Sequence, residues 1–244
     1  MTSTARKVAI VGAMHDELRA LLAHMPDEAP VMRAGREFWI GHLEGREVVV
    51  VLSRIGKVAA ATTASVLLTE FDVDRIVFTG TAGGLGDGVQ VGDVVVADAL
   101  LQHDMDASPL FPRHEVPLYG LDRFAADVAM SNALASAAHA ALGALGAGEA
   151  RVHRGLLISG DRFVSERSEN NALRARLPDA LAVEMEGAAL AQVCHDFGVP
   201  FAVVRTVSDR ADDTAHVDFN RFVAEVASHY TLAIVQHYLR SLAP

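Results

Sequence analysis

The sequence predicts a protein of the α/β class. Short apolar runs of strand length alternate along the chain with segments that repeat apolar residues at helical spacing. Such alternation is typical of a sheet whose faces are covered by helices. The chain has 244 residues, of which 51% are hydrophobic, so it can bury the core of one large domain. No repeat, low-complexity segment or linker divides it, and we therefore expect a single domain over residues 1–244.

The first predicted unit is a buried strand at residues 8–11, a Gly-Ala-Met turn and a helix that opens at residues 15–17. Apolar residues at positions 18, 21, 22 and 25 form the stripe of this helix. Glu17 thus lies in the first helical turn, where an acid is favoured by the helix dipole whether or not it has a function. Residues 37–43 and 47–53 are expected to form a hairpin, and an alanine-rich helix follows that ends near Phe71.

A strand at residues 75–78 leads into the glycine-rich stretch 79–86. A loop of this composition lets main-chain N–H groups approach a ligand, although a plain tight turn would have the same composition. Gly56 and Lys57 are followed by Val58 rather than by serine or threonine, which excludes a Walker A loop.

The middle of the chain is predicted as a strand at 91–101, a helix at 123–145 and a strand at 152–159. A long irregular segment, 102–121, separates the first two, and such a segment is usually functional or at an interface. It carries His103, Asp104, Asp106 and His114, but no HExxH motif is present, so we expect no metal site.

Two carboxylates, Glu184 and Glu186, follow an apolar run that ends at residue 183. A helix is expected over 185–197, with Cys194 buried on it, and a further strand over 201–207 ends at Asp209. Each apolar run therefore delivers a carboxylate at its carboxyl end, which is the ligand-binding edge of open α/β sheets. The alternative is that the two glutamates only compensate a helix dipole. The last predicted helix carries on one face Phe222, Val226, Tyr230, Ile234 and Tyr238.

The charge balance bears on the class of partner. With 21 Lys+Arg and 31 Asp+Glu the net charge is −10, which argues against nucleic acid or an anionic membrane as the partner. The single cysteine excludes an intramolecular disulfide and a CxxC pair. No apolar run approaches the ~18 residues of a membrane span. We therefore expect a cytoplasmic protein.

Six short motifs occur in an order that resembles a known family. They are Gly-Ala-Met with Glu17, Ile-Gly-Lys-Val-Ala-Ala at 55–60, Thr-Gly-Thr-Ala-Gly-Gly at 79–84, Ser-Gly-Asp at 159–161 with Phe163, Val-Glu-Met-Glu at 183–186, and Ser-Asp at 208–209. The chain resembles the 5′-methylthioadenosine/S-adenosylhomocysteine nucleosidases of the purine nucleoside phosphorylase superfamily over residues 8–238. The resemblance implies a three-layer α/β/α domain around a central mixed sheet, a homodimer, an adenine nucleoside as substrate and no cofactor.

The resemblance also implies roles for individual residues. Asp209 resembles the acid that protonates adenine, and Glu17 the residue that activates water. Met185 and Glu186 would hold the ribose. Phe163 would stack on adenine, although an aromatic residue there is also typical of a core, and the main chain of Val164 would bond the edge of the base. The other expected substrate-binding residues are Ile55, Thr81, Gly83, Ser208 and Phe219.

The segment 102–121 contains two apolar stretches, at 107–112 and 116–119, that are too apolar for a free loop. In the related family this region reaches across the dimer, so Ala107, Leu110 and Pro117 are expected to line the 5′ end of the neighbouring subunit's site. The alternative is that the segment folds back on its own subunit.

The residues support cleavage of an N-ribosidic bond, in which an acid protonates the leaving base and a carboxylate activates water. The chain departs from the family at Thr81, where serine is usual, at Arg54, where glycine is usual, and at His15-Asp16, which replace a more acidic pair. An arginine near the water could bind phosphate, so a nucleoside phosphorylase is an alternative, although Glu17 would repel phosphate. A second alternative is a non-catalytic nucleoside-binding protein.

Overall fold

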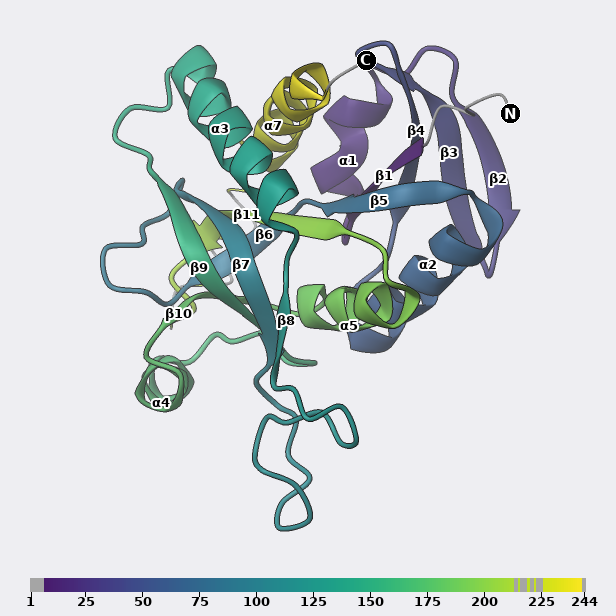
Figure 1. Ribbon diagram of the computed structural model, residues 1–244. Coiled ribbons are helices and arrows are strands. Elements are labelled where there is room, and N and C mark those ends of the chain that lie inside the picture. Colours follow the sequence, from purple (N-terminus) through teal and green to yellow (C-terminus); the bar gives the residue numbers. More distant parts are fainter. Residues whose placement is uncertain (1–6, 213–214, 216–218, 220–221, 223–225, 243–244) are drawn as a thin grey trace.

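The computed structural model describes residues 7–212, 215, 219, 222 and 226–242 of the chain. In this part, eleven strands form one mixed sheet in the order β2-β3-β4-β1-β5-β11-β6-β10-β9-β7-β8 (Figure 1). The strands are β1 (Lys7–Gly12), β2 (Ala29–Arg33), β3 (Arg36–Leu43), β4 (Arg46–Leu52), β5 (Val73–Phe78), β6 (Thr81–Gly84), β7 (Val94–Gln102), β8 (Arg123–Ala125), β9 (Val152–Ser159), β10 (Ala180–Glu184) and β11 (Phe201–Asp209). The helices are α1 (His15–Leu22), α2 (Lys57–Glu70), α3 (Val128–Leu145), α4 (Arg167–Arg176), α5 (Gly187–Phe197) and α7 (Ser228–Ser241).

The sheet has an open half and a closed half. In the open half β4, β1, β5 and β11 run parallel, with β2 and β3 added as antiparallel neighbours. In the other half β11 pairs with both β6 and β7, so that β11, β6, β10, β9 and β7 close into a ring. The shared strand β11 thus ends at the junction of the two halves.

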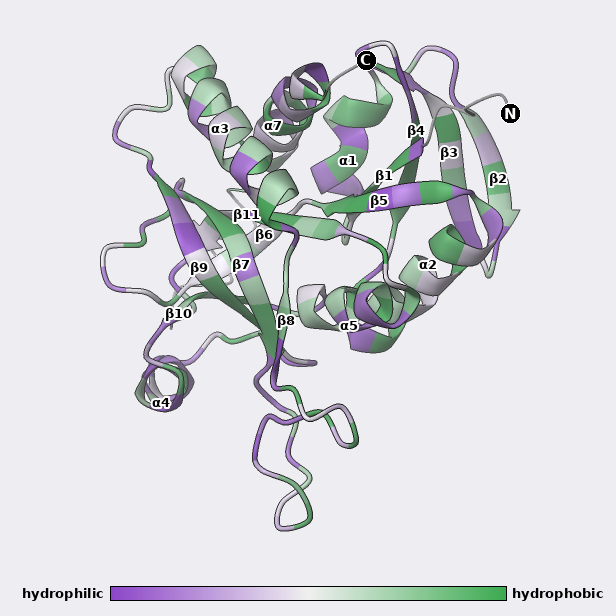
Figure 2. Ribbon diagram, viewed as in Figure 1, coloured by the Kyte–Doolittle hydropathy of each residue, from purple (hydrophilic) through white to green (hydrophobic). Residues whose placement is uncertain are grey.

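Residue alternation in the strands creates the two helical layers. In β1, Val8 and Ile10 belong to a core cluster that includes residues of α1, α3 and α7, whereas Ala9 and Val11 belong to one that includes residues of α2 and α5. Successive side chains of a strand point to opposite faces, so one apolar strand supplies both cores. Figure 1 shows α1, α3 and α7 on one side of the sheet and α2 and α5 on the other, and Figure 2 shows the apolar character of the strands between them. The expected three-layer α/β/α arrangement around a mixed sheet is confirmed.

Several predicted boundaries were wrong. Residues 123–125 are not helical, because they pair as β8 with β7, and α3 begins only after Asp127, whose carboxylate accepts the N–H of Met130 at 2.8 Å. The strand predicted from residue 91 begins at Val94. The glycine-rich stretch is not only a loop, because residues 81–84 form the central strand β6.

Two elements were not predicted at all. The strand β2 is a mostly exposed edge strand, so it lacks the apolar alternation that marks a half-buried strand. The helix α4 is almost entirely polar and buries only Asn170 and Leu173, so its apolar stripe is too short to detect. Cys194, by contrast, is buried on α5 as predicted.

In the described part of the chain one helix, α3, is long and apolar enough to cross a membrane, with a mean hydropathy of 1.3 over 18 residues. A core helix passes the same test, and Leu134, Ala138 and Leu142 of α3 lie in the core cluster shared with α7 and β7. The predicted apolar face of the last helix is confirmed for Ile234 and Tyr238, whereas Phe222 packs in a separate small cluster.

Candidate active site

A cavity of about 340 Å³ lies at the ends of β1, β10 and β11 and along β6. Its volume is in the range of small-molecule sites. Four of its lining residues are acidic, and they are Glu17, Glu184, Glu186 and Asp209. The other described lining residues are Ala13, Met14, Ile55, Thr81, Ala82, Gly83, Phe163, Val183, Met185, Ser208 and Phe219.

The carboxylates meet here for a reason other than the predicted one. The strands β10 and β11 do not run parallel, since β11 is parallel to β6 and β10 is antiparallel to it. They lie on either side of β6, where Gly83 is in register with Val183 on one side and with Asp209 on the other. The closed half of the sheet, rather than the common edge of a parallel sheet, therefore brings Glu184 and Asp209 to one cavity.

The side chain of Glu17 connects the start of its own helix, α1, to β6. Its Oε2 accepts the N–H groups of Ala13 at 2.9 Å and Met14 at 3.0 Å, and its Oε1 accepts the N–H and the hydroxyl of Thr81, both at 3.0 Å. The side chain is buried, and a Cβ at Gly80 would lie 3.0 Å from its Oε1. Glu17 thus satisfies the start of its helix, as the first-turn reading expected, and also faces the cavity. The hydroxyl of Thr81 does what a serine hydroxyl would do.

Asp209 ends β11 and is buried beside Gly83. Its Oδ1 accepts the N–H of Ala211 at 2.7 Å, and its Oδ2 accepts the hydroxyl of Ser208 at 2.8 Å. A Cβ at Gly83 would lie 2.9 Å from Asp209 Oδ1 and 2.9 Å from the Ala211 Cβ, so only glycine fits there.

Glu186 lies after the end of β10 and before the start of α5. The described hydrogen bond to its side chain comes from the N–H of Gly56, which lies 2.7 Å from Oε1. Burial, together with the charge of Glu184, raises the pKa of Glu186 to about 8. Its carboxyl group is therefore largely protonated in the free site at neutral pH, and positive charge developing nearby would favour its ionised form.

Glu184 faces the same cavity but is paired with a cation. Its Oε2 lies 2.7 Å from a guanidinium nitrogen of Arg205, and both side chains are almost completely buried. Its carboxylate also accepts the N–H of Gly187 at 2.9 Å and a short hydrogen bond from the hydroxyl of Ser159. The guanidinium of Arg205 stacks on Phe78 at 4.1 Å from the ring centroid. The helix α5 begins at Gly187 rather than at residue 185, so neither glutamate lies in its first turn, and Glu184 contacts the helix start only through the N–H of Gly187.

Two aromatic side chains, Phe163 and Phe219, line part of the cavity. Phe163 is 40% exposed and meets Phe219 edge to face at 5.6 Å between centroids. Phe163 is thus not a core residue. Val164 is buried and lines a small adjoining cavity of about 30 Å³ together with Phe163, Asp209 and Arg162, and the guanidinium of Arg162 lies 3.2 Å from Glu169.

Arg54 does not face the cavity. Its side chain is exposed and donates a hydrogen bond to the carbonyl of Gly35. Its main chain has a φ of 68°, a conformation that favours glycine, which gives a physical reason for the usual glycine at this position. The buried Arg205 could also meet a phosphate by its place in the chain, but it is paired with Glu184. No lysine or arginine is among the described residues that line the main cavity.

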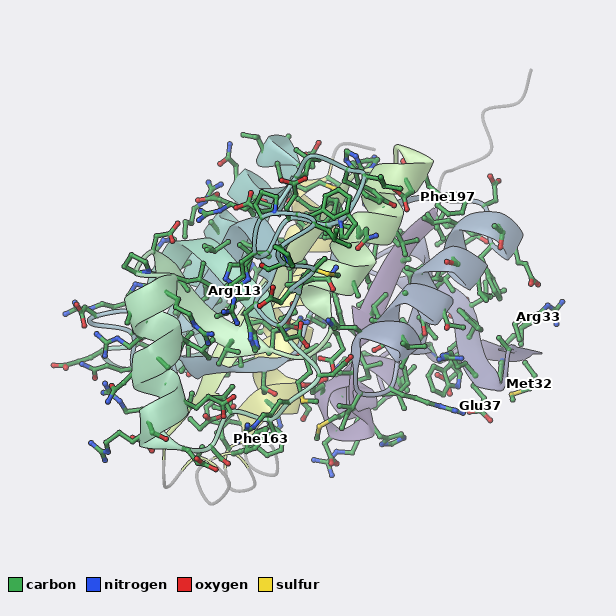
Figure 3. All side chains as sticks on the ribbon, turned by 90° about the horizontal axis from the view of Figure 1, so that it is seen from below. Met32, Arg33, Glu37, Arg113, Phe163 and Phe197 are labelled. Carbon is green, nitrogen blue, oxygen red and sulfur yellow. The ribbon has the colours of Figure 1, made fainter. Side chains whose placement is uncertain are left out.

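Ala107, Leu110 and Pro117 do not line the cavity of their own chain. They belong to residues 102–121, which we call the projecting segment because it extends below the sheet in Figure 1. Leu110 is 84% exposed and Leu118 is 90% exposed. Figure 3, viewed from the side of this segment, shows Phe163 at one margin of the molecule and Phe197, at the end of α5, at the opposite margin.

Sequence reasoning missed several lining residues, namely Ala13, Met14, Ala82 and Val183. Ala13 and Met14 lie in the turn after β1, and their place at the carboxyl end of a strand could have indicated them. Ala82 and Val183 are immediate neighbours of predicted site residues. Within the described ranges, no group of three or more histidine, cysteine, aspartate or glutamate side chains could hold a metal ion.

Comparisons with known proteins show which family the chain resembles. A model of the phosphorylase superfamily matches residues 7–240. The 5′-methylthioadenosine/S-adenosylhomocysteine nucleosidase of Chromohalobacter salexigens is 38% identical over 230 residues, which cover 94% of this chain and 95% of that protein. The corresponding nucleosidase of Shewanella denitrificans is 36% identical and covers 94% of this chain and 97% of that protein.

A solved structure shows the same fold. The nucleosidase of Neisseria meningitidis, in complex with methylthio-immucillin-A, has a TM-score of 0.89 at 36% identity, and the match covers 97% of this chain and all of that one. These matches show that the chain belongs to the phosphorylase superfamily and, within it, to the family of 5′-methylthioadenosine/S-adenosylhomocysteine nucleosidases.

Proposed function

We propose that the protein hydrolyses the N-ribosidic bond of 5′-methylthioadenosine and S-adenosylhomocysteine, and that Asp209 and Glu17 carry out the chemistry. The products are adenine and the 5-thio-substituted ribose. The observation that carries this proposal is a cavity lined by four carboxylates and aromatic side chains, without a lysine or arginine among its described lining residues.

We assign the two roles from the position of each carboxyl group in the cavity. Adenine is a poor leaving group as an anion, so Asp209, beside the aromatic end, donates a proton to the base as the bond breaks. Glu17, already accepting four hydrogen bonds in a fixed orientation, takes the proton of the attacking water. Thr81 and Gly83 lie on the strand between the two groups, next to the ribose and the water.

Glu186 and Met185 bind the ribose in this proposal. The sugar gains positive charge in an oxocarbenium-like transition state, and that charge stabilises the ionised form of Glu186. Its hydrogen bonds to the ribose hydroxyls are then stronger in the transition state than in the ground state, which is the condition for raising kcat. Phe163 and Phe219 cover the base, the main chain of Val164 bonds its edge, and Ile55 and Ser208 complete the wall.

Water rather than phosphate is the acceptor, because phosphate would need cationic donors where this cavity presents acids. The test is incubation with methylthioadenosine in phosphate-free buffer, with adenine measured by chromatography. We expect adenine and methylthioribose. A rate that requires phosphate and yields a ribose 1-phosphate would establish the phosphorylase instead, and binding without turnover would establish a nucleoside-binding protein.

The protein is further proposed to be a homodimer in which the projecting segment closes the 5′ end of the partner's cavity. The helix α2 has apolar side chains outside its buried face, since Val58 on it is 79% exposed, and Ile55 before it is 56% exposed. Leu110 and Leu118 of the projecting segment are exposed as well, and exposed apolar side chains are typical of an interface. Ala107, Leu110 and Pro117 would provide the apolar wall that an alkylthio group needs.

The dimer is tested by sedimentation of the wild type and of Leu110→Asp. We expect a dimer at micromolar concentration, and we expect the variant to dissociate more readily and to have a raised KM for methylthioadenosine with its fold intact. A fully active monomer would contradict the proposal. Side-by-side kinetics on methylthioadenosine, S-adenosylhomocysteine, 5′-deoxyadenosine and aminofutalosine measure the preference for the 5′ group. The acidic charge and the single, buried cysteine favour a cytoplasmic location, which cell fractionation tests.

A further inference from the structure

Three polar residues outside the cavity join the segments that carry its two halves. Asp104 lies two residues after the end of β7, Lys57 is the first residue of α2, and Asp161 lies two residues after the end of β9. The cavity is not lined by any of these three residues. The catalytic proposal therefore does not use them, although each is next to a segment that it does use.

The three residues form a closed triangle of short contacts. Asp104 Oδ1 lies 2.6 Å from the ammonium group of Lys57, and Asp104 Oδ2 accepts the N–H of Asp161 at 2.9 Å. Asp161 Oδ1 in turn accepts the N–H of Lys57 at 2.7 Å. Each side of the triangle joins two different segments of the chain, so no segment can shift without breaking two contacts.

The first corner of the triangle, Lys57, is next to the half of the site that would bind the ribose. The N–H of Gly56, adjacent to Lys57, lies 2.7 Å from Oε1 of Glu186. The ammonium of Lys57 also contacts Gln102 Oε1 at 3.1 Å, and the amide of Gln102 donates to Gln192 on α5 at 2.8 Å. The position of Lys57 therefore sets where the N–H of Gly56 meets Glu186.

The second corner fixes the purine half. Asp161 belongs to the loop 160–164, which carries Phe163 and Val164. The first residue of this loop, Gly160, is packed so closely against the imidazole of His103 that a Cβ there would lie 2.3 Å from His103 Nε2. The loop is thus held by Asp104 and by His103, which precedes Asp104 in the sequence.

We propose that Asp104 is a positioning residue that, through Lys57 and Asp161, keeps the ribose-binding and purine-binding halves of the site in a fixed relation. This inference rests on the proposed function. Burial opposes ionisation of Asp104, but the hydrogen bonds from Lys57 and from the N–H of Asp161, together with the charge of Lys57, outweigh it and lower the pKa of the carboxyl group, so the contact with Lys57 is an ion pair at neutral pH. Fixed geometry matters because small displacements of substrate-positioning groups can reduce rates by up to about 10²-fold.

The test compares a ligand of one half with a ligand of both. Adenine occupies only the purine half, and its inhibition constant reports on that half, whereas KM for methylthioadenosine reports on both. Asp104→Ala removes both contacts, and we expect both constants to rise by about 10-fold or more. Lys57→Met removes the ion pair but keeps its own N–H bond to Asp161, so we expect KM to rise while adenine binds as in the wild type.

The double variant Asp104→Ala/Lys57→Met should have nearly the kcat/KM of Asp104→Ala alone, because the ion pair that Lys57→Met removes is already absent in Asp104→Ala. A matched control is Lys7→Met, which removes a partly exposed lysine–carboxylate pair with Glu47 at 3.2 Å, at the end of β1 away from the cavity. We expect this control to leave both constants unchanged.

The outcomes separate this inference from the proposed function. If the wild type releases no adenine, the proposed function fails before any variant is made. If the wild type is active and Asp104→Ala lowers only the melting temperature, leaving KM and the adenine constant unchanged, the triangle is merely structural and the inference is overturned. Should Asp104→Ala fail to fold, Lys57→Met decides, since equal changes for adenine and for the nucleoside would contradict it.

Discussion

Glu184 and Glu186 are two residues apart and face one cavity, but their removal should change stability in opposite directions. The matched variants are Glu184→Gln and Glu186→Gln, each of which removes one carboxylate and keeps the side-chain shape. Glu184 is paired with Arg205 at 2.7 Å in a fully buried site. Removing one partner of a buried pair leaves an uncompensated charge and costs about 3–5 kcal/mol. For a chain of this size that lowers Tm by about 6–20 °C.

Removal of the Glu186 carboxylate should instead raise the stability, because the pKa of Glu186 is raised to about 8 from the ordinary value of 4.5. The folded state therefore binds more protons than the unfolded state between these values, and stability is lost as pH rises from about 4.5 to 8. The linkage between protonation and folding lowers the free energy of unfolding by up to about 1 kcal/mol at pH 5 and by about 3 kcal/mol at pH 7. Glu186→Gln should relieve this cost, so its Tm should exceed that of the wild type by an amount that grows with pH.

The assay is thermal and urea unfolding of both variants and the wild type at pH 5, 7 and 8, together with turnover of methylthioadenosine. We expect Glu186→Gln to be the more stable protein and the poorer enzyme, since the ribose carboxylate is lost. We expect Glu184→Gln to be less stable and to retain more turnover per folded molecule. A lower Tm for Glu186→Gln at pH 8, or the reverse order of turnover, would refute the assignment of the buried pair to one glutamate and the ribose to the other.

The remaining predictions concern the reacting groups and two backbone positions. Asp209→Asn and Glu17→Gln should each lose at least ~10²-fold in kcat, the scale of general acid–base catalysis, while still binding an adenine nucleoside in calorimetry; near-normal turnover removes that residue from the mechanism. Gly83→Ala should abolish turnover, because its Cβ would lie 2.9 Å from Asp209 Oδ1, and an active variant would contradict the packing around the acid. Arg54→Gly should leave the rate and its independence of phosphate unchanged, because the guanidinium bonds the carbonyl of Gly35 outside the cavity; a phosphate effect that disappears in this variant would count against water as the acceptor.

Much of the candidate site could be predicted from local sequence. The turn after the first strand placed Glu17 at the start of a helix, and the apolar run ending at residue 207 placed Asp209 at a strand end. These features depend on contacts within one or two helical turns, which strand and helix periodicity report directly. The glycine-rich stretch also marked the position of Gly83, although its reason, the close approach of Asp209 and Ala211, involves residues more than a hundred positions away.

The tertiary structure decided the features that depend on distant partners. At the junction between β10 and α5 neither the strand period nor the helix period applies, so periodicity did not separate the surroundings of the two glutamates. The tertiary structure separates them, because Arg205 pairs with Glu184, 21 residues earlier in the chain. The direction of β10 relative to β11 was likewise invisible, because β6 is a strand of four small residues without an apolar pattern. The direction of Arg54 away from the cavity follows from its bond to Gly35 on the neighbouring hairpin, a contact that no local pattern encodes.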